Sequence, residues 1–211
     1  MLKYKYIIWD WNGTLLNDIG ASLASVNDML AARGREPIDI VYYKECISVP
    51  IIGFYEKVFD MEKEDYSQII KQYNEGYLHY LKDVGLTDGT IEALEYFKQN
   101  GAKQVVVSSS NNEQVLQNVK KYGILDYFDE ILGSGDYFAG SKIERAKAYL
   151  YRNNARSSEI LVIGDLEHDA EMADTLGADC ILLTSGHEHP ERLKNTKKPL
   201  ADTLFQVLNM V

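Results

Sequence analysis

The sequence predicts an α/β fold, in which a parallel β-sheet carries helices on both faces and is interrupted by an inserted all-helical segment. Two observations lead to this prediction. The apolar run Tyr6–Trp9 is followed at once by Asp10 and an Asn-Gly turn, which is typical of a buried strand with a polar residue at its carboxyl end. From Thr90 onward, strand-like runs alternate with helix-like stretches of ten or more residues, the pattern of parallel βαβ units with right-handed crossovers.

The segment between these two parts is expected to be helical. Residues 18–34 carry apolar side chains at helical spacing and end in a glycine that can stop a helix. Shorter helices are expected over residues 39–60, around the Ser48-Val49-Pro50 break. Residues 62–82 place tyrosines and isoleucines at steps of three, four and seven, and we interpret this stripe as a packing face.

The elements expected after this segment follow one another in a regular order. They are the helix Thr90–Asn100, the strand Gln104–Val107, the helix Asn112–Lys121, the strand Glu130–Leu132, the helix Ser141–Arg152, the strand Ile160–Ile163, a helix through Met172 to Leu176, the strand Cys180–Leu183 and a terminal helix near residues 202–208. We therefore expect a Rossmann-like core made of residues 1–16 and 85–211, with a helical cap formed by residues 17–84.

The composition limits the possible partners. The 211 residues carry 22 Lys and Arg against 32 Asp and Glu, a net charge of −10, which argues against nucleic-acid binding because phosphate backbones are held by clustered basic side chains. The two cysteines, Cys46 and Cys180, do not suggest a disulfide framework or a zinc site. Neither a secretory signal nor an apolar run of membrane-spanning length is evident. We expect a cytoplasmic protein without membrane contacts, either a monomer or a homodimer.

Polar residues follow the predicted strands at four places. Asp10 ends the first strand, Ser108, Ser109 and Ser110 end the second, Lys142 follows Gly140-Ser141 at the start of a helix, and Asp165 ends the fourth strand with Asp169 four residues later. In a doubly wound sheet, the strand ends near the switch point converge on one crevice. We therefore expect these side chains to meet there.

The chemistry of such a cluster is coherent. Three carboxylates close together repel one another unless a proton or a cation intervenes. Mg²⁺ suits them, because it takes oxygen ligands and binds through one or two carboxylates plus a substrate phosphate. The Ser108 hydroxyl and nearby backbone N–H groups can hold a phosphoryl oxygen, and Lys142 would offset negative charge. Such a site can transfer a phosphoryl group to an aspartate and then hydrolyse the aspartyl phosphate.

With these motifs in this order, the sequence resembles the haloacid dehalogenase (HAD) superfamily, and within it the phosphoglycolate-phosphatase-like branch that carries a helical cap after the first motif. Residues 10–14 resemble its first motif, Ser108 its second, Lys142 its third, and Gly164-Asp165 with Asp169 its fourth. The resemblance covers essentially the whole chain. It implies a Mg²⁺-dependent phosphatase for a small phosphorylated metabolite, with phosphoglycolate as the default substrate of the branch.

The resemblance also implies a role for each motif residue. Asp10 would be the nucleophile, and Asp10 and Asp165 would bind Mg²⁺ together with the backbone carbonyl of Asn12. Asp169 would support the metal from behind these ligands. The remaining expected contacts come from Thr14, Ser108, Ser109 and Ser110 on the substrate phosphate and from Lys142 as the catalytic cation.

One residue departs from the family pattern. The position two after the nucleophile is usually a second Asp that protonates the leaving oxygen and then activates water, whereas here it is Asn12, whose amide has no proton to transfer at neutral pH. Losing general acid–base catalysis typically costs about 10²–10⁴ in rate. Three interpretations stay open. The enzyme acts on substrates with good leaving groups such as acyl phosphates, or Glu167 or His168 supplies the proton, or the protein binds phosphorylated ligands and turns them over slowly.

Other functions fit the sequence less well. A dehalogenase is expected to carry an aromatic residue in place of Asn12, and a phosphonatase a small residue together with a reactive cap lysine, a role for which nothing marks Lys44 or Lys57. Receiver-like domains also use an Asp, a Ser or Thr and a Lys at strand ends. Their acidic pair precedes the phosphorylated Asp, however, and they lack a helical insert of this size. His187, near a turn after the fifth strand, is expected to have a structural role.

Overall fold

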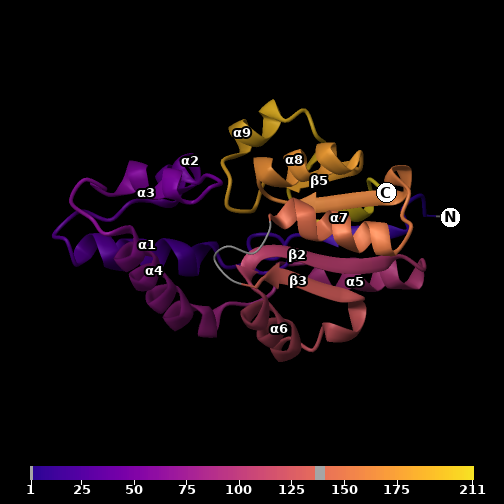
Figure 1. Ribbon diagram of the computed structural model, residues 1–211, viewed down its shortest axis with the longest axis horizontal. Helices are drawn as coiled ribbons and strands as arrows, with labels where there is room; N and C mark the ends of the chain where they lie inside the picture. Colours follow the sequence, from indigo (N-terminus) through magenta and orange to yellow (C-terminus); the bar gives the residue numbers. More distant parts are fainter. Residues whose placement is uncertain (1, 136–140) are drawn as a thin grey trace.

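The computed structural model of the chain describes residues 2–135 and 141–211 (Figure 1). In that part of the chain, a six-stranded parallel sheet runs in the order β3-β2-β1-β4-β5-β6. The strands are β1 (Tyr6–Trp9), β2 (Lys103–Asn111), β3 (Glu130–Ser134), β4 (Ile160–Gly164), β5 (Asp179–Leu183) and β6 (Leu200–Ala201). The predicted α/β class with a parallel sheet is confirmed.

The short strand β1 lies at the centre of this sheet. Its last residue, Trp9, pairs with Val106 of β2 on one side and with Ile163 of β4 on the other. The chain steps outward from β1 through β2 and β3, and then returns to the opposite side of β1 with β4. The strand order therefore reverses between β1 and β4, which is where ligands bind in doubly wound sheets.

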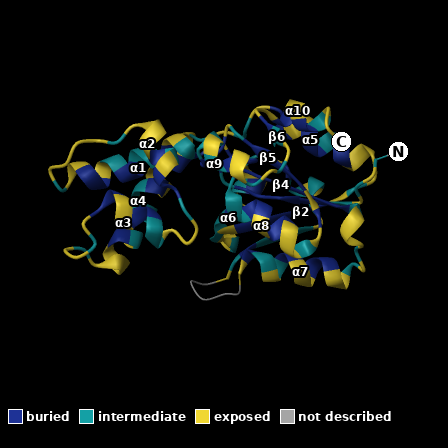
Figure 2. Ribbon diagram, turned by 90° about the horizontal axis from the view of Figure 1, so that it is seen from above, coloured by how far each residue is buried: buried dark blue, intermediate teal, exposed yellow. Residues whose placement is uncertain are grey.

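Helices cover both faces of the sheet, as the alternation of strands and helices predicts. One apolar cluster joins the sheet to α5 (Thr90–Gln99), α6 (Asn112–Lys121) and α10 (Leu204–Leu208), and the other joins it to α7 (Lys142–Arg152), α8 (Glu167–Leu176) and α9 (Pro190–Asn195). Figure 2 shows α5 and α10 on one side of the strands and α7 on the other. Because side chains alternate along a strand, Ile7 and Trp9 enter the first cluster and Ile8 the second.

Between β1 and β2 the chain forms four further helices, here called the helical insert. They are α1 (Ile19–Ala31), α2 (Ile40–Cys46), α3 (Ile52–Val58) and α4 (Tyr66–Tyr80). The insert has its own apolar cluster, built around Val26, Phe54 and Ile69, and α1 packs along α4. Figure 1 shows it beside the sheet, at the end where β1 leads into α1. The tyrosine stripe lies on α4, where the rings of Tyr73 and Tyr77 stack with centroids 5.8 Å apart.

The expected helices and strands are present, with a few differences in extent. β2 continues to Asn111, because its end pairs again with β3 at Ser134 after a register shift, so the three serines lie in the strand and not in a turn after it. The sequence predicted neither α9, which begins at Pro190, nor the two-residue strand β6. Gly140, expected to precede α7, lies outside the described residues. The structure also has three 3₁₀ turns, Leu81–Asp83, Leu125–Tyr127 and Ser157–Glu159.

Over residues 2–135 and 141–211, the helices are all too short or too polar to cross a lipid bilayer.

The packing of α5 on the sheet yields a stability prediction. Phe97 is fully buried and its ring meets that of Trp9 edge to face, with centroids 5.7 Å apart. We expect Phe97→Ala to lower the free energy of unfolding by about 3–5 kcal/mol, because it leaves a cavity between helix and strand. Ile91→Ala on the same helix is the control, since Ile91 is 44% exposed and its loss should change that free energy by about 0.5 kcal/mol or less. Urea unfolding measures both, and equal effects would contradict this account of the core.

Candidate active site

The end of β1 and the end of β4 bring two aspartates together. Asp10 continues the parallel ladder beyond β1, since its backbone N–H donates to the carbonyl of Ile163 at 2.9 Å. Asp165 follows Gly164, the last residue of β4. The two strands are neighbours, so the residues after them lie at the same edge of the sheet. This edge is the point where the strand order reverses.

Three buried carboxylates and one buried ammonium group form the centre of the site. Asp10, Asp165 and Asp169 each offer an oxygen within 4.8 Å of the others. Lys142, the first residue of α7, donates from Nζ to Asp10 Oδ1 and, at 2.6 Å, to Asp169 Oδ1. One positive charge thus faces three carboxyl groups that water scarcely reaches. Of the seven residues that the motifs predicted to meet, the structure brings these four into direct proximity.

The pKa values of these groups are shifted because the cluster holds more carboxyl groups than positive charges. Burial, together with the charge of Asp169, raises the pKa of Asp10 to about 6, although Lys142 opposes the shift. Burial and the two neighbouring carboxylates raise the pKa of Asp165 well above its usual range, although the charge of His187 opposes the shift. Burial lowers the pKa of Lys142, but Asp10 and Asp169 outweigh that effect and raise it overall. A second cation would relieve this repulsion, and the all-oxygen donor set fits Mg²⁺.

Asp169 is held from several sides. Its Oδ2 accepts hydrogen bonds from the backbone N–H groups of Asp165 and Leu166, both at 3.1 Å, while its Oδ1 faces Lys142. A Cβ at Gly164 would lie only 2.2 Å from the carboxyl carbon of Asp169, so a glycine is required there. Both oxygens of Asp169 are therefore engaged in fixing Lys142 and the turn that carries Asp165.

Asp165 is held in turn by hydrogen bonds from the loop after β1 and from the loop after β5. The Thr14 hydroxyl donates to its Oδ1 at 3.1 Å, and the backbone N–H of His187 donates to its Oδ2 at 2.6 Å. Gly13 has a positive φ of 72°, and a Cβ on it would lie 2.3 Å from Asp165 Oδ2. We expected Thr14 to contact the substrate phosphate. In this structure its hydroxyl donates to Asp165, the predicted metal ligand.

The three serines at the end of β2 occupy different surroundings. Ser108 is buried, and its Oγ accepts the backbone N–H of Ser110 at 3.1 Å. Ser110 donates from its hydroxyl to Asn12 Oδ1 at 2.6 Å, which ties β2 to the loop after β1. Ser110 is therefore hydrogen-bonded directly to the loop after β1, and Ser108 is linked to it through Ser110. Ser109 lies on the surface.

Both ends of the Asn12 amide are engaged. Besides accepting from Ser110, Asn12 donates from Nδ2 to Asp18 Oδ2 at 2.7 Å and to the Tyr77 hydroxyl at 2.9 Å. The amide is therefore held in one orientation by contacts to β2, to the start of α1 and to α4. Of these partners, the sequence reading missed Asp18 and Tyr77 as members of the site.

Asp18 is the residue that the sequence reading assigned to the start of a helix. It does precede α1, but its side chain makes no capping bond to that helix. Its carboxylate is buried and accepts from the Gly13 N–H at 2.8 Å, from the Tyr77 hydroxyl at 2.8 Å, from His187 and from Asn12. Burial raises its pKa, but the His187 charge and these hydrogen bonds lower it overall. An Asp before a helix usually caps it, so the pattern of residues around Asp18 did not indicate this role.

His187, for which we expected only a structural role, also lies in the site. Its Nε2 lies 3.1 Å from Asp18 Oδ1, and its Nδ1 lies 2.9 Å from the Tyr43 hydroxyl of α2. Burial lowers its pKa, but the charges of Asp18, Asp165 and Asp10 and the bond to Asp18 raise it overall to about 9. The His187 ring thus bridges the Asp18 carboxylate and the Tyr43 hydroxyl.

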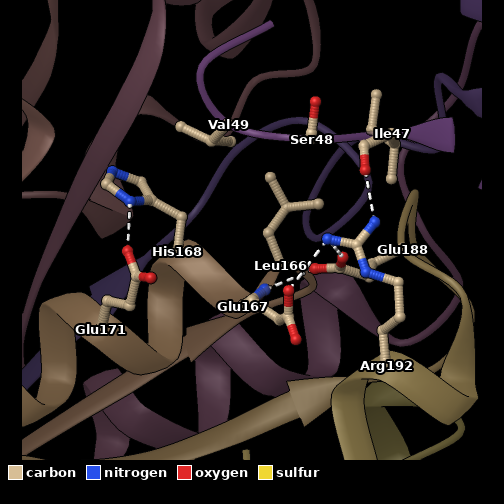
Figure 3. Close-up of a pocket in the computed structure, with 9 residues that line it drawn as sticks. All are labelled: Ile47, Ser48, Val49, Leu166, Glu167, His168, Glu171, Glu188 and Arg192. Carbon is tan, nitrogen blue, oxygen red and sulfur yellow. Dashed lines mark hydrogen bonds and ion pairs between the residues drawn. The ribbon is translucent and has the colours of Figure 1, made fainter. Parts of the chain in front are cut away.

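Glu167 and His168, the two alternative proton donors, line a pocket beside the helical insert. Figure 3 shows Glu167 and His168 at a pocket whose far side is formed by Ile47, Ser48 and Val49 of the insert. The Glu167 carboxylate pairs with Arg192 at 2.9 Å, and the His168 ring lies 3.2 Å from Glu171. Among the described residues, neither side chain is hydrogen-bonded to Asp10 or Asn12.

Comparison with known proteins agrees with this geometry. A family model described as haloacid dehalogenase-like hydrolase matches residues 7–183. Phosphoglycolate phosphatases from Rhodobacter capsulatus and Cereibacter sphaeroides are 24% and 27% identical over 190 and 189 residues. These alignments cover 86% and 87% of this chain and 84% and 86% of those proteins.

Solved structures show the same fold at low identity. A haloacid dehalogenase-like family hydrolase from Streptococcus pneumoniae superposes with a TM-score of 0.84 at 18% identity, and a predicted phosphoglycolate phosphatase from Haemophilus somnus with 0.78 at 20%. Each superposition covers 100% of this chain and 99% of the other. With the matched residues spanning β1 to β5, the chain belongs to the haloacid dehalogenase-like hydrolase family.

Proposed function

We propose that the protein is a Mg²⁺-dependent phosphatase that forms a phosphoaspartyl intermediate on Asp10. One observation carries this proposal, namely that three buried carboxylates meet a single lysine where the strand order reverses. The curated relatives bear the name phosphoglycolate phosphatase, which supports a small phosphorylated metabolite as substrate and makes phosphoglycolate the ester to compare with acyl phosphates. In this proposal residues 17–84 act as a cap on the core of residues 1–16 and 85–211.

The reaction proceeds in two displacements at phosphorus. A carboxylate oxygen of Asp10 attacks the phosphorus while the bond to the leaving oxygen breaks and its electron pair departs with that oxygen. Water then attacks the same phosphorus while the bond between phosphorus and the Asp10 oxygen breaks, which restores the Asp10 carboxylate, and the proton lost by the water leaves with the inorganic phosphate. The ammonium group of Lys142 touches Asp10 throughout and offsets negative charge. Bound Mg²⁺, held by Asp10, Asp165 and the Asn12 carbonyl, would neutralise charge on the phosphoryl oxygens.

Asn12 restricts which leaving groups depart readily. Its amide carries no transferable proton, and both of its ends are already hydrogen-bonded. An acyl phosphate or anhydride releases a weakly basic oxygen that needs little protonation, whereas an alkyl phosphate releases an alkoxide. The proposed enzyme therefore favours acyl phosphates and anhydrides over simple esters.

A binding protein with little turnover is the second candidate. The observation that favours it is again the engaged amide of Asn12, combined with Glu167 and His168 contacting other groups. Such a protein would still bind Mg²⁺ and phosphate at the three carboxylates. Release of phosphate from acetyl phosphate distinguishes the two candidates.

The nucleophile gives the first test of the proposal. We expect Asp10→Asn to reduce Mg²⁺-dependent phosphate release from acetyl phosphate by roughly 10⁴-fold or more, because no covalent intermediate can form. Asp174→Asn is the matched control, since the Asp174 side chain is 67% exposed on α8 and pairs with Lys198. It should leave the rate unchanged. Release that survives Asp10→Asn would exclude the phosphoaspartyl route.

Metal binding has a test that does not depend on turnover. We expect added Mg²⁺ to raise the thermal unfolding midpoint of the wild type, since a ligand at a hundred times its Kd stabilises a fold by about 2.7 kcal/mol. Asp165→Asn removes one carboxylate of the cluster and should abolish this rise. Asp174→Asn should keep it. An equal rise in all three proteins would place the ion elsewhere.

Restoring a carboxyl group at position 12 tests the account of the leaving group. The new carboxyl in Asn12→Asp would lie near Asp18 Oδ2, where the amide nitrogen now stands 2.7 Å away, and the like charge would keep it protonated. We expect hydrolysis of p-nitrophenyl phosphate to change little and that of alkyl phosphates to rise by about 10²–10⁴. Steady-state kinetics on both substrates measure this. If alkyl phosphates gain nothing, Asn12 does not limit the reaction.

A further inference from the structure

We propose that Asp18 is a positioning residue, which ties the turn carrying the nucleophile to the helical insert. This inference rests on the proposed function, because the turn that Asp18 holds is the one that follows Asp10. Among the described residues, the hydrogen bonds of Asp18 go to neither Asp10 nor Lys142. It acts through Asn12 and Gly13 on one side and through the insert on the other.

Four donors converge on the Asp18 carboxylate and use both of its oxygens. Oδ1 accepts from the Gly13 N–H at 2.8 Å and from His187 Nε2 at 3.1 Å. Oδ2 accepts from Asn12 Nδ2 at 2.7 Å and from the Tyr77 hydroxyl at 2.8 Å. The side chain is only 1% exposed, so water cannot replace any of these partners. Rotation of the carboxylate would break several bonds at once.

These donors come from three separate parts of the chain. Gly13 and Asn12 belong to the turn after β1, Tyr77 belongs to α4 of the insert, and His187 belongs to the loop after β5. Tyr77 closes a triangle, because its hydroxyl donates to Asp18 and accepts from Asn12 at 2.9 Å. A change in the position of α4 would therefore move the hydrogen-bond partner of the Asn12 amide, two residues after the nucleophile.

A second connection reaches the insert through His187. The His187 ring bridges Asp18 and the Tyr43 hydroxyl, so Asp18 is joined to α2 through His187 and to α4 directly. The insert is thus held on the turn by two helices at once.

The same geometry explains what an asparagine contributes at position 12. Two residues beyond the nucleophile, the side chain faces a buried carboxylate at 2.7 Å. An ionised Asp in that place would repel Asp18, whereas the amide of Asn12 supplies an N–H to Asp18 and another to Tyr77. Asn12 thereby completes the link between turn and insert.

The experiment compares two phenylalanine variants on one helix. Tyr77→Phe removes the hydroxyl that contacts Asp18 and Asn12. Tyr80→Phe is the matched control, since the Tyr80 hydroxyl also donates to an aspartate, Asp28 Oδ2, at 2.8 Å on the exposed surface. With acetyl phosphate and Mg²⁺, we expect Tyr77→Phe to lower kcat about tenfold with KM within about twofold, and Tyr80→Phe to change neither by more than about twofold.

A second readout does not require turnover. Hydrogen–deuterium exchange of the peptide covering residues 10–16 reports the Gly13 N–H, which donates to Asp18. We expect exchange of this peptide to become about tenfold faster in Tyr77→Phe than in the wild type or Tyr80→Phe, while the β4 peptide stays unchanged.

The outcomes separate this inference from the proposed function. Unchanged exchange in Tyr77→Phe overturns the link between turn and insert, whatever the activity. Faster exchange with an unchanged kcat overturns the positioning role. Faster exchange with a lowered kcat supports both. If the wild type releases no phosphate, the proposed function fails, and exchange alone decides whether Asp18 ties the turn to the insert.

Discussion

The crowding of three carboxylates around one lysine is the constraint on which the site depends. Asp10, Asp165 and Asp169 are all buried, and Lys142 neutralises only part of their charge. Each carboxylate is therefore supported by backbone N–H groups or hydroxyls, such as the Thr14 hydroxyl on Asp165. Close approach of the backbone at Gly13 and Gly164 leaves room for these acids. The local excess of negative charge is what makes the site suited to a cation and, with it, to a phosphate.

The strand order of the sheet makes the meeting of these carboxylates predictable. Asp10 and Asp165 follow adjacent strands in the sheet, although the sequence separates them widely, because the chain returns to β1 with β4. The polar residue at the end of an apolar run is visible in the sequence, and so is the helix start at Lys142. Parallel pairing brings the strand ends to one edge, so the sequence alone predicts that these residues meet.

Other members of the site could not be predicted, because their roles arise from contacts between distant elements. Asp18 has the pattern of an ordinary helix cap, and only the docking of α4 and the loop after β5 turns its carboxylate toward Asn12. Tyr77 belongs to a stripe that does pack, with Tyr73 stacked on it, yet its hydroxyl serves the site. The length of β2 likewise depends on renewed pairing with β3 and not on its own composition.

The central position of β1 also has a consequence for how the chain reaches its fold. β1 is made first, but its partners are residues 103–106 and 160–163, so it waits for most of the chain to be synthesised. At about 5–20 residues per second, a ribosome needs on the order of ten seconds for that interval. The helical insert, whose contacts are local, can form in the meantime. The apolar run Ile7-Ile8-Trp9, fully buried in the folded protein, therefore stays exposed in the nascent chain until these partner strands have been made.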